Sequence, residues 1–129
     1  AIDRGNKHVA YLHEPLHPAV MRALKRVIDC AHREGIGVSV CGELGADPYC
    51  LPILLGMGVD SISATPQSIP GIKHLIRSLN AEKCMDLARS VVMTHDVAAA
   101  NSLVTETLSQ DLRHDLAFHT TMIHTGGSA

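Results

Sequence analysis

Apolar residues recur along most of this chain at the spacing of three and four that is typical of amphipathic helices. The clearest run lies between Pro18 and Gly35, where charged residues separate the apolar ones. Proline suits the first helical position because its missing N–H would have no partner there, and glycine suits the residue that ends the last turn. We therefore predict a helix from Pro18 to about Gly35, with an apolar face of Val20, Leu24, Val27, Ile28 and Ala31.

The same period predicts four further helices. We expect them at about 47–58, 68–79, 81–93, and from residue 94 or 96 to 112. The first of these four begins at Asp47 or Pro48, and Asn80 can cap the third. Their predicted apolar faces, in order, are Leu51, Leu54 and Leu55; Ile69, Ile72, Ile76 and Leu79; Met85, Ala88 and Val92; and Val97, Ala100, Val104 and Leu108.

Two short segments have the alternating pattern of strands instead. In residues 36–41, Val38 and Val40 alternate with Gly37 and Ser39, and the run ends at Cys41. A second strand is expected at 59–63, where the alternation is imperfect. Strands that alternate with helices in this order are typical of βα repeats, so we predict an α/β fold with parallel strands.

Cys41 is the first candidate functional residue because it closes the first predicted strand, just before a turn that contains glycine at positions 42 and 45. Ligands of α/β proteins bind at the carboxyl ends of the strands. Position alone does not decide the matter, since free cysteines are more often buried as small apolar residues. Cys30, Cys50 and Cys84 lie in predicted helices, and we expect these three to serve packing.

Composition and charge exclude several classes of function. The chain has 129 residues, 46% of them hydrophobic, which suits one domain with an ordinary core. Its 11 basic and 13 acidic residues are interspersed and only three residues are aromatic, so we expect no nucleic-acid partner. No apolar run approaches the ~20 residues that span a bilayer, so we expect a cytoplasmic protein without membrane contact. We predict no metal site at His8, His13 and His17, because prolines break this segment.

Four blocks of sequence carry a resemblance to a known family. They are Asp3-Arg4-Gly5-Asn6, Cys41-Gly42-Glu43-Leu44-Gly45-Ala46-Asp47, Leu54-Leu55-Gly56-Met57-Gly58-Val59-Asp60 and Ser68-Ile69-Pro70-Gly71-Ile72-Lys73. In order and spacing they resemble the end of the TIM barrel of the phosphoenolpyruvate (PEP)-utilising enzymes, most of all the PEP-protein phosphotransferases, enzyme I of the bacterial phosphotransferase system. The chain departs from the family in the order Gly45-Ala46, where the family has alanine and then glycine, and in the loop 64–67. We expect two small residues to tolerate the exchange.

The resemblance implies the C-terminal portion of a (β/α)8 TIM barrel, with its last two strands and their helices, plus extra C-terminal helices. Residues 1–112 would form this part of the PEP-binding barrel domain, and 113–129 would be a flexible tail. The chain would then be a piece of a longer protein.

The activity implied by the resemblance is transfer of the phosphoryl group of PEP to a protein histidine, with release of pyruvate. Cys41 matches the cysteine that protonates the enolate of pyruvate, and a thiol with a pKa of about 8.5 carries that proton at neutral pH. Arg4 matches the arginine that binds the phosphate group of PEP, for which a guanidinium is suited. Gly42 and Glu43 would support the loop beside Cys41.

Other parts of such an enzyme would lie outside this chain. The resemblance implies Mg²⁺ as cofactor, with ligands on earlier strands, and a separate domain that carries the phosphorylated histidine and contacts the phosphocarrier protein HPr. It also implies a homodimer. We therefore expect the isolated chain to be inactive as a phosphotransferase.

Two alternatives stay open at this point. The parent could be the nitrogen-regulatory paralogue of enzyme I, or a PEP synthase or pyruvate phosphate dikinase, which share the cysteine motif. From a different class, the chain could act as a non-catalytic self-association module, because an incomplete barrel exposes strand edges and apolar helix faces.

Overall fold

The computed structural model describes residues 8–9 and 14–111 of the chain. Within this part, six helices and two short strands follow one another in the order α1 (Pro18–Arg33), β1 (Ser39–Cys41), α2 (Glu43–Ala46), α3 (Leu51–Met57), β2 (Ser61–Ser63), α4 (Ile69–Ser78), α5 (Ala81–Met93) and α6 (Val97–Asp111). The fold is therefore mixed, mostly helical with a small parallel sheet, as in part of an α/β domain.

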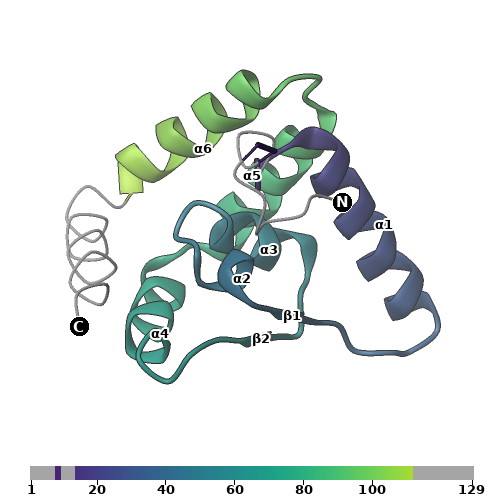
Figure 1. The fold of residues 1–129 in the computed structure, drawn as a ribbon, viewed down its shortest axis with the longest axis vertical. Helices are drawn as coiled ribbons and strands as arrows, with labels where there is room; N and C mark the ends of the chain where they lie inside the picture. The colour runs from purple at the N-terminus through teal and green to yellow at the C-terminus, as the bar shows by residue number, and fades with distance from the viewer. Residues whose placement is uncertain (1–7, 10–13, 112–129) are drawn as a thin grey trace.

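The two strands lie side by side at one end of the molecule, with α2 and α3 next to them and α6 at the opposite end (Figure 1). Ser39 pairs with Ser61, Val40 with Ile62 and Cys41 with Ser63. Successive side chains of a strand point to opposite faces. Val40 and Ile62 are half-buried against the core, whereas the other residues of both strands are exposed. One face of the sheet is thus covered by helices and the other is open.

Helix α3 lies at the centre of the core and contacts α5 most closely. Leu51, Ile53 and Leu54 are fully buried. At Gly56 the two helices approach so closely that an added Cβ atom would lie 1.9 Å from the backbone oxygen of Cys84. Only glycine permits this approach, which holds α3 between the sheet and the C-terminal helices.

Several predicted helix ends are confirmed by their hydrogen bonds. Asn80 caps α5, since its side-chain oxygen accepts a hydrogen bond from the Lys83 N–H at 3.1 Å. The Asp96 carboxylate accepts one from Ala99 N–H at 2.7 Å in the first turn of α6. Helix α1 begins at Pro18 and ends at Arg33, two residues before Gly35, whose φ is +70°.

Between the two strands the predicted boundaries are wrong. The helix expected from Asp47 or Pro48 begins only at Leu51, and the short helix α2 was not predicted. The cause is the Asp47 carboxylate, which accepts hydrogen bonds from Tyr49 N–H at 2.8 Å and Cys50 N–H at 3.1 Å. An aspartate that binds the backbone in this way holds a turn ahead of the helix. Both strands are also shorter than expected, at three residues each.

The predicted apolar faces are only partly right. Val27 of α1 is 59% exposed, whereas Met21, which the prediction omitted, is fully buried. In α4 the buried residues are Ile72 and Leu75, while Ile69 and Ile76 are exposed; in α5 Met85 is exposed. The face of α6 is confirmed at Ala100, Val104 and Leu108. The errors occur where apolar residues cover more than one side of a helix, so the spacing does not determine which side faces the core.

No helix within the described residues is both long and apolar enough to cross a membrane. Arg4 and the predicted tail 113–129 lie outside the described residues.

Candidate active site at the end of strand β1

Cys41 is the last residue of β1, and its side chain lies on the open face of the sheet. Its register partner on β2 is Ser63, which is exposed on the same face. Within the described part of the chain no hydrogen bond engages the Cys41 thiol. The carboxyl ends of the two parallel strands therefore present a thiol and a hydroxyl next to each other, both accessible to a ligand.

The turn after Cys41 depends on glycine at position 42. Gly42 has φ +83° and ψ −162°, a backbone conformation that residues with side chains rarely adopt. An added Cβ would meet no atom within 4 Å, so the requirement is for backbone conformation and not for space. Glu43 then begins helix α2 and is exposed.

Helix α2 is held against the strands at Gly45. This residue is buried, and an added Cβ would lie 2.7 Å from Cγ2 of Ile62. A methyl group at position 45 would push Ile62, the neighbour of Ser63 on β2. The chain accommodates the order Gly45-Ala46, as expected, but an alanine at position 45 would require Ile62 to shift.

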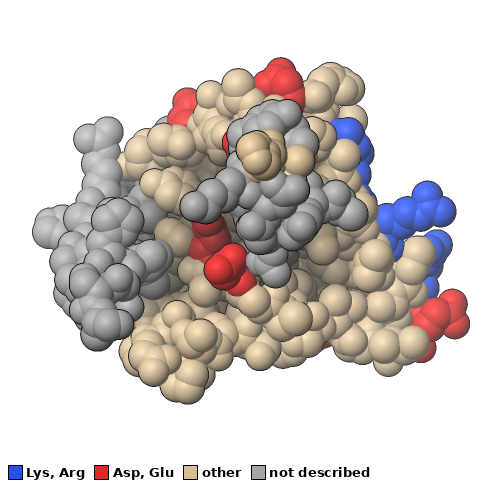
Figure 2. Space-filling view, viewed as in Figure 1, with Lys and Arg blue, Asp and Glu red and all other residues tan. Residues whose placement is uncertain are grey.

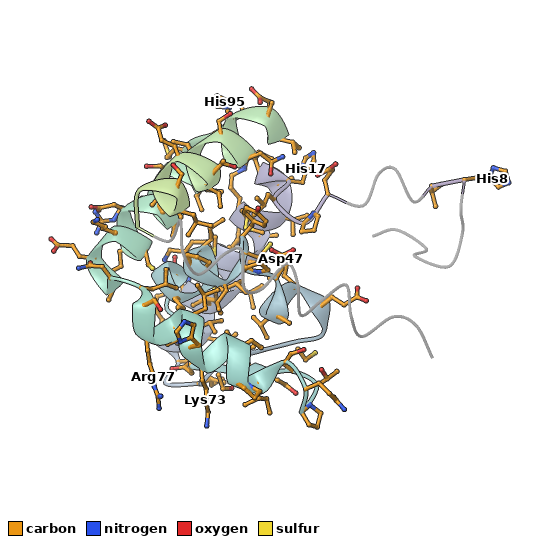
Figure 3. The ribbon with its side chains drawn as sticks, turned by 90° about the vertical axis from the view of Figure 1, so that its left-hand side faces the viewer. His8, His17, Asp47, Lys73, Arg77 and His95 are labelled. Carbon is orange, nitrogen blue, oxygen red and sulfur yellow. The ribbon has the colours of Figure 1, made fainter. Side chains whose placement is uncertain are left out.

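Asp47 and Cys50 form the next layer beneath this turn. Burial raises the pKa of the Cys50 thiol, and the charge of Asp47 and a hydrogen bond from the thiol to its carboxylate raise the pKa further. Cys50 is 1% exposed, so it stays protonated and serves packing, as predicted. Cys84 is also buried. Asp47 is half-buried, and Figure 3 shows Lys73 and Arg77 pointing outward from α4.

Asp60 fixes the opposite end of the strands. Its Oδ2 atom accepts a hydrogen bond from Val38 N–H at 2.7 Å and lies 2.8 Å from Nε2 of His32, at the end of α1. The bond from Val38 lowers the pKa of the Asp60 carboxyl, and the bond with His32 lowers it further. These hydrogen bonds connect α1, β1 and the start of β2 at the end of the strands opposite Cys41.

The structure brings three of the four predicted site residues together, since Cys41, Gly42 and Glu43 occupy one strand end and the turn after it. Arg4 lies outside the described residues. Sequence reasoning missed Ser63, although a signal was present: Ser39-Val40-Cys41 and Ser61-Ile62-Ser63 share one pattern of exposed small residues around an apolar one.

No group of three or more His, Cys, Asp or Glu residues within the described residues is arranged to hold a metal ion. Of the three histidines near the start, His13 lies outside the described residues, and Figure 3 shows His8 and His17 well apart.

Comparison with known proteins places this site in a family. Residues 1–81 match the family model described as PEP-utilising enzyme, PEP-binding domain. Over 111 residues the chain is 39% identical to the phosphoenolpyruvate-protein phosphotransferase of Haemophilus influenzae. The aligned region is 86% of this chain and 19% of that protein. The corresponding enzyme of Geobacillus stearothermophilus is 38% identical over 109 residues, or 84% of this chain and 19% of that protein.

Multiphosphoryl transfer protein 1 of Escherichia coli K12 is 37% identical over 118 residues, which is 91% of this chain and 14% of that protein. The chain thus spans less than a fifth of the length of these relatives. The match covers the block that contains Cys41, Gly42 and Glu43. The chain therefore belongs to the PEP-utilising enzymes, in the family described as their PEP-binding domain.

Proposed function

We propose that this chain forms the C-terminal part of the PEP-binding barrel of a PEP-protein phosphotransferase, and that Cys41 is its proton donor. In this proposal β1 and β2 are the last two strands of a (β/α)8 barrel, and their open face is turned toward the barrel axis. The observation that carries the proposal is the exposed thiol of Cys41 at the carboxyl end of a parallel strand, where TIM-barrel enzymes place their chemistry. The names of the relatives support the substrate, PEP.

The chemistry assigned to Cys41 is one proton transfer. Loss of the phosphoryl group from PEP to a histidine leaves the enolate of pyruvate. The S–H bond of Cys41 then breaks, its proton joins the methylene carbon through the electron pair of the enolate, and a thiolate remains until solvent returns the proton. A thiol can act as a general acid in this direction.

The turn after Cys41 supports this role. Gly42 takes a backbone conformation suited to glycine, and Gly45 packs directly on Ile62. These two features hold the backbone next to Cys41 in place. Glu43 belongs to the same turn, and we assign it support of the loop. Arg4 would bind the phosphate group of PEP.

Other parts of the proposal concern the whole protein. The relatives are more than five times as long as the matched part of this chain, so the phosphorylated histidine and the contact with HPr would belong to other segments. The described residues form no group that could hold a metal ion, so Mg²⁺ would be bound by residues outside them. A cytoplasmic location, a homodimer and inactivity of the isolated chain belong to the same proposal.

Replacement of Cys41 in the intact phosphotransferase tests the assignment. General acid catalysis contributes on the order of 100-fold or more, so Cys41→Ala should lower the rate of pyruvate formation by about that factor with little change in PEP binding. Met93→Ala is the control, because Met93 is 75% exposed at the end of α5, far along the chain from β1. Full activity of Cys41→Ala would exclude Cys41 as the acid.

Self-association is the second candidate, favoured by the open sheet. Within the described residues each strand has one neighbour, so each has an unpaired edge, and Ile36 just before β1 is 59% exposed. Unpaired edges next to apolar residues promote pairing with another chain. This candidate needs no thiol chemistry, so it predicts that replacement of Cys41 has no effect on function.

A further inference from the structure

A recess of about 780 Å³ lies along α1, away from the carboxyl end of β1. Its lining comes from one helix, apart from Val92 near the end of α5. Four of the 11 basic residues of the chain line it, against one carboxylate. Figure 2 shows the Lys and Arg side chains gathered at this edge of the molecule, over α1. The lining residues are Arg22, Lys25, Arg26, Asp29, Cys30, His32, Arg33 and Val92.

Two of the arginines in this groove are held in place by the protein. Nη1 of Arg22 donates hydrogen bonds to the carbonyl oxygens of Thr94 at 2.9 Å and Val92 at 3.4 Å, at the end of α5. Nη2 of Arg33 donates to Sγ of Cys30 at 2.9 Å. A guanidinium has five N–H donors, so both retain donors for a ligand. Because these side chains are already ordered, less entropy is lost when an anion binds.

Arg26 lies between them on the same helix face, one turn after Arg22. No hydrogen bond or ion pair joins Arg26 to another described residue. Asp29, the one carboxylate of the groove, pairs with Lys25. Three guanidinium groups therefore line the groove without a carboxylate partner among the described residues.

We propose that this groove binds a small anion with two linked phosphate groups, such as pyrophosphate or the diphosphate of a nucleotide. The planar fork of arginine matches phosphate oxygens, and two adjacent phosphates fit a row of arginines better than one. Arg22 and Arg26 are four residues apart, about 6 Å along the helix, so two linked phosphate groups can contact both of them. Arg33 extends the row of arginines seven residues beyond Arg26. The volume of the recess is in the range of small-molecule sites. The groove is independent of the function proposed for Cys41.

Calorimetric titration of the chain with inorganic pyrophosphate at low ionic strength tests the proposal. Exposed charge pairs contribute up to about 1 kcal/mol, so Arg26→Ala should weaken binding by about 3- to 5-fold. The matched control is Arg77→Ala, which removes the same charge from α4, where Arg77 points outward in Figure 3. The Arg77→Ala variant should bind pyrophosphate with the affinity of the unaltered chain. Orthophosphate should bind the unaltered chain more weakly than pyrophosphate does.

Cys30 provides a second readout inside the groove. Pyrophosphate should slow the reaction of Cys30 with iodoacetamide and leave the rate at Cys41 unchanged, as measured by mass spectrometry of the two peptides. Titration with ADP distinguishes a nucleotide ligand from free pyrophosphate. Tighter binding of ADP than of pyrophosphate would identify a nucleotide as the ligand, and equal binding would show that only the diphosphate is recognised. The proposal would be overturned if Arg26→Ala and Arg77→Ala lost the same affinity for pyrophosphate. It would also be overturned if pyrophosphate protected neither thiol or both thiols, or if the chain bound a glutamate-rich peptide more tightly than pyrophosphate.

Discussion

Cys41 and Ser63 are register partners in the parallel sheet, and both side chains lie on its exposed face. Adjacent strands are about 4.8 Å apart, so the thiol and the hydroxyl can reach one small ligand together. The turn at Gly42 and the packing of Gly45 on Ile62 fix this strand end from behind. This relationship gives the proposed proton donor, Cys41, a defined position in the fold.

The cysteines should differ strongly in reactivity. Cys41 is exposed, whereas Cys50 and Cys84 are buried, and burial together with Asp47 raises the pKa of Cys50. The thiolate is the reactive form, so iodoacetamide at pH 8 should modify Cys41 in the folded chain and reach Cys50 and Cys84 only after denaturation. Mass spectrometry of the modified peptides measures this. Modification of Cys50 as fast as Cys41 would show that the layer beneath the turn is not packed as described.

Substitution of Gly42 should destabilise the chain through its backbone. Gly42→Ala places a side chain at φ +83°, and residues held in such conformations cost about 1–3 kcal/mol. Gly37→Ala is the matched control, because its φ is not positive and its added Cβ meets Asp60 Oδ2 at an ordinary distance of 3.7 Å. We expect the control to change the free energy of unfolding by less than about 0.5 kcal/mol. Urea denaturation measures both, and equal effects would contradict the account of the turn.

Asp60 should make stability depend on pH in the acid range. Its pKa lies below the ordinary value of about 3.9 because it accepts the Val38 N–H and a bond with His32. A carboxyl whose pKa is lowered by folding stabilises the folded state above its unfolded pKa, and this contribution is lost as the pH falls through the folded pKa. Asp60→Asn should therefore be less stable at pH 7 and lose less stability between pH 5 and pH 3. Urea midpoints over this range test the sign, and unchanged pH dependence in Asp60→Asn would contradict it.

The isolated chain should self-associate. Unpaired strand edges and exposed apolar side chains, such as Ile36 and Val27 at 59% exposure each, favour contact with a second copy. Light scattering at increasing concentration should give a mass above the 13.8 kDa of the chain. A monomer at every concentration tested would count against the self-association candidate and leave the assignment of Cys41 unaffected.

Local signals were enough to predict much of this structure. Pro18 and Asn80 determined where α1 and α5 begin, and the spacing of Ala100, Val104 and Leu108 gave the buried face of α6 correctly. The position of Cys41 at a strand end followed from the Gly-Val-Ser-Val alternation and the glycine after it. These features depend on residues close together in the sequence, which is why the sequence reveals them.

Features that depend on distant residues were missed. Ser63 is a neighbour of Cys41 only through the sheet register, and Met21 is buried only because α1 packs in one particular orientation. The turn at Asp47 is a local exception: its carboxylate accepts hydrogen bonds from the backbone two and three residues later, whereas the proline at position 48 favours a helix start. The need for glycine at position 45 arises from Ile62, seventeen positions later in the sequence.

Proton exchange at the methyl group of pyruvate tests the central claim most directly. In deuterated water, the intact phosphotransferase that carries this chain should incorporate deuterium into pyruvate through Cys41. We predict that Cys41→Ala reduces the exchange rate by about 100-fold or more, while Met93→Ala retains it. Exchange at the unaltered rate in Cys41→Ala would show that another group delivers the proton and would contradict the role assigned to this thiol.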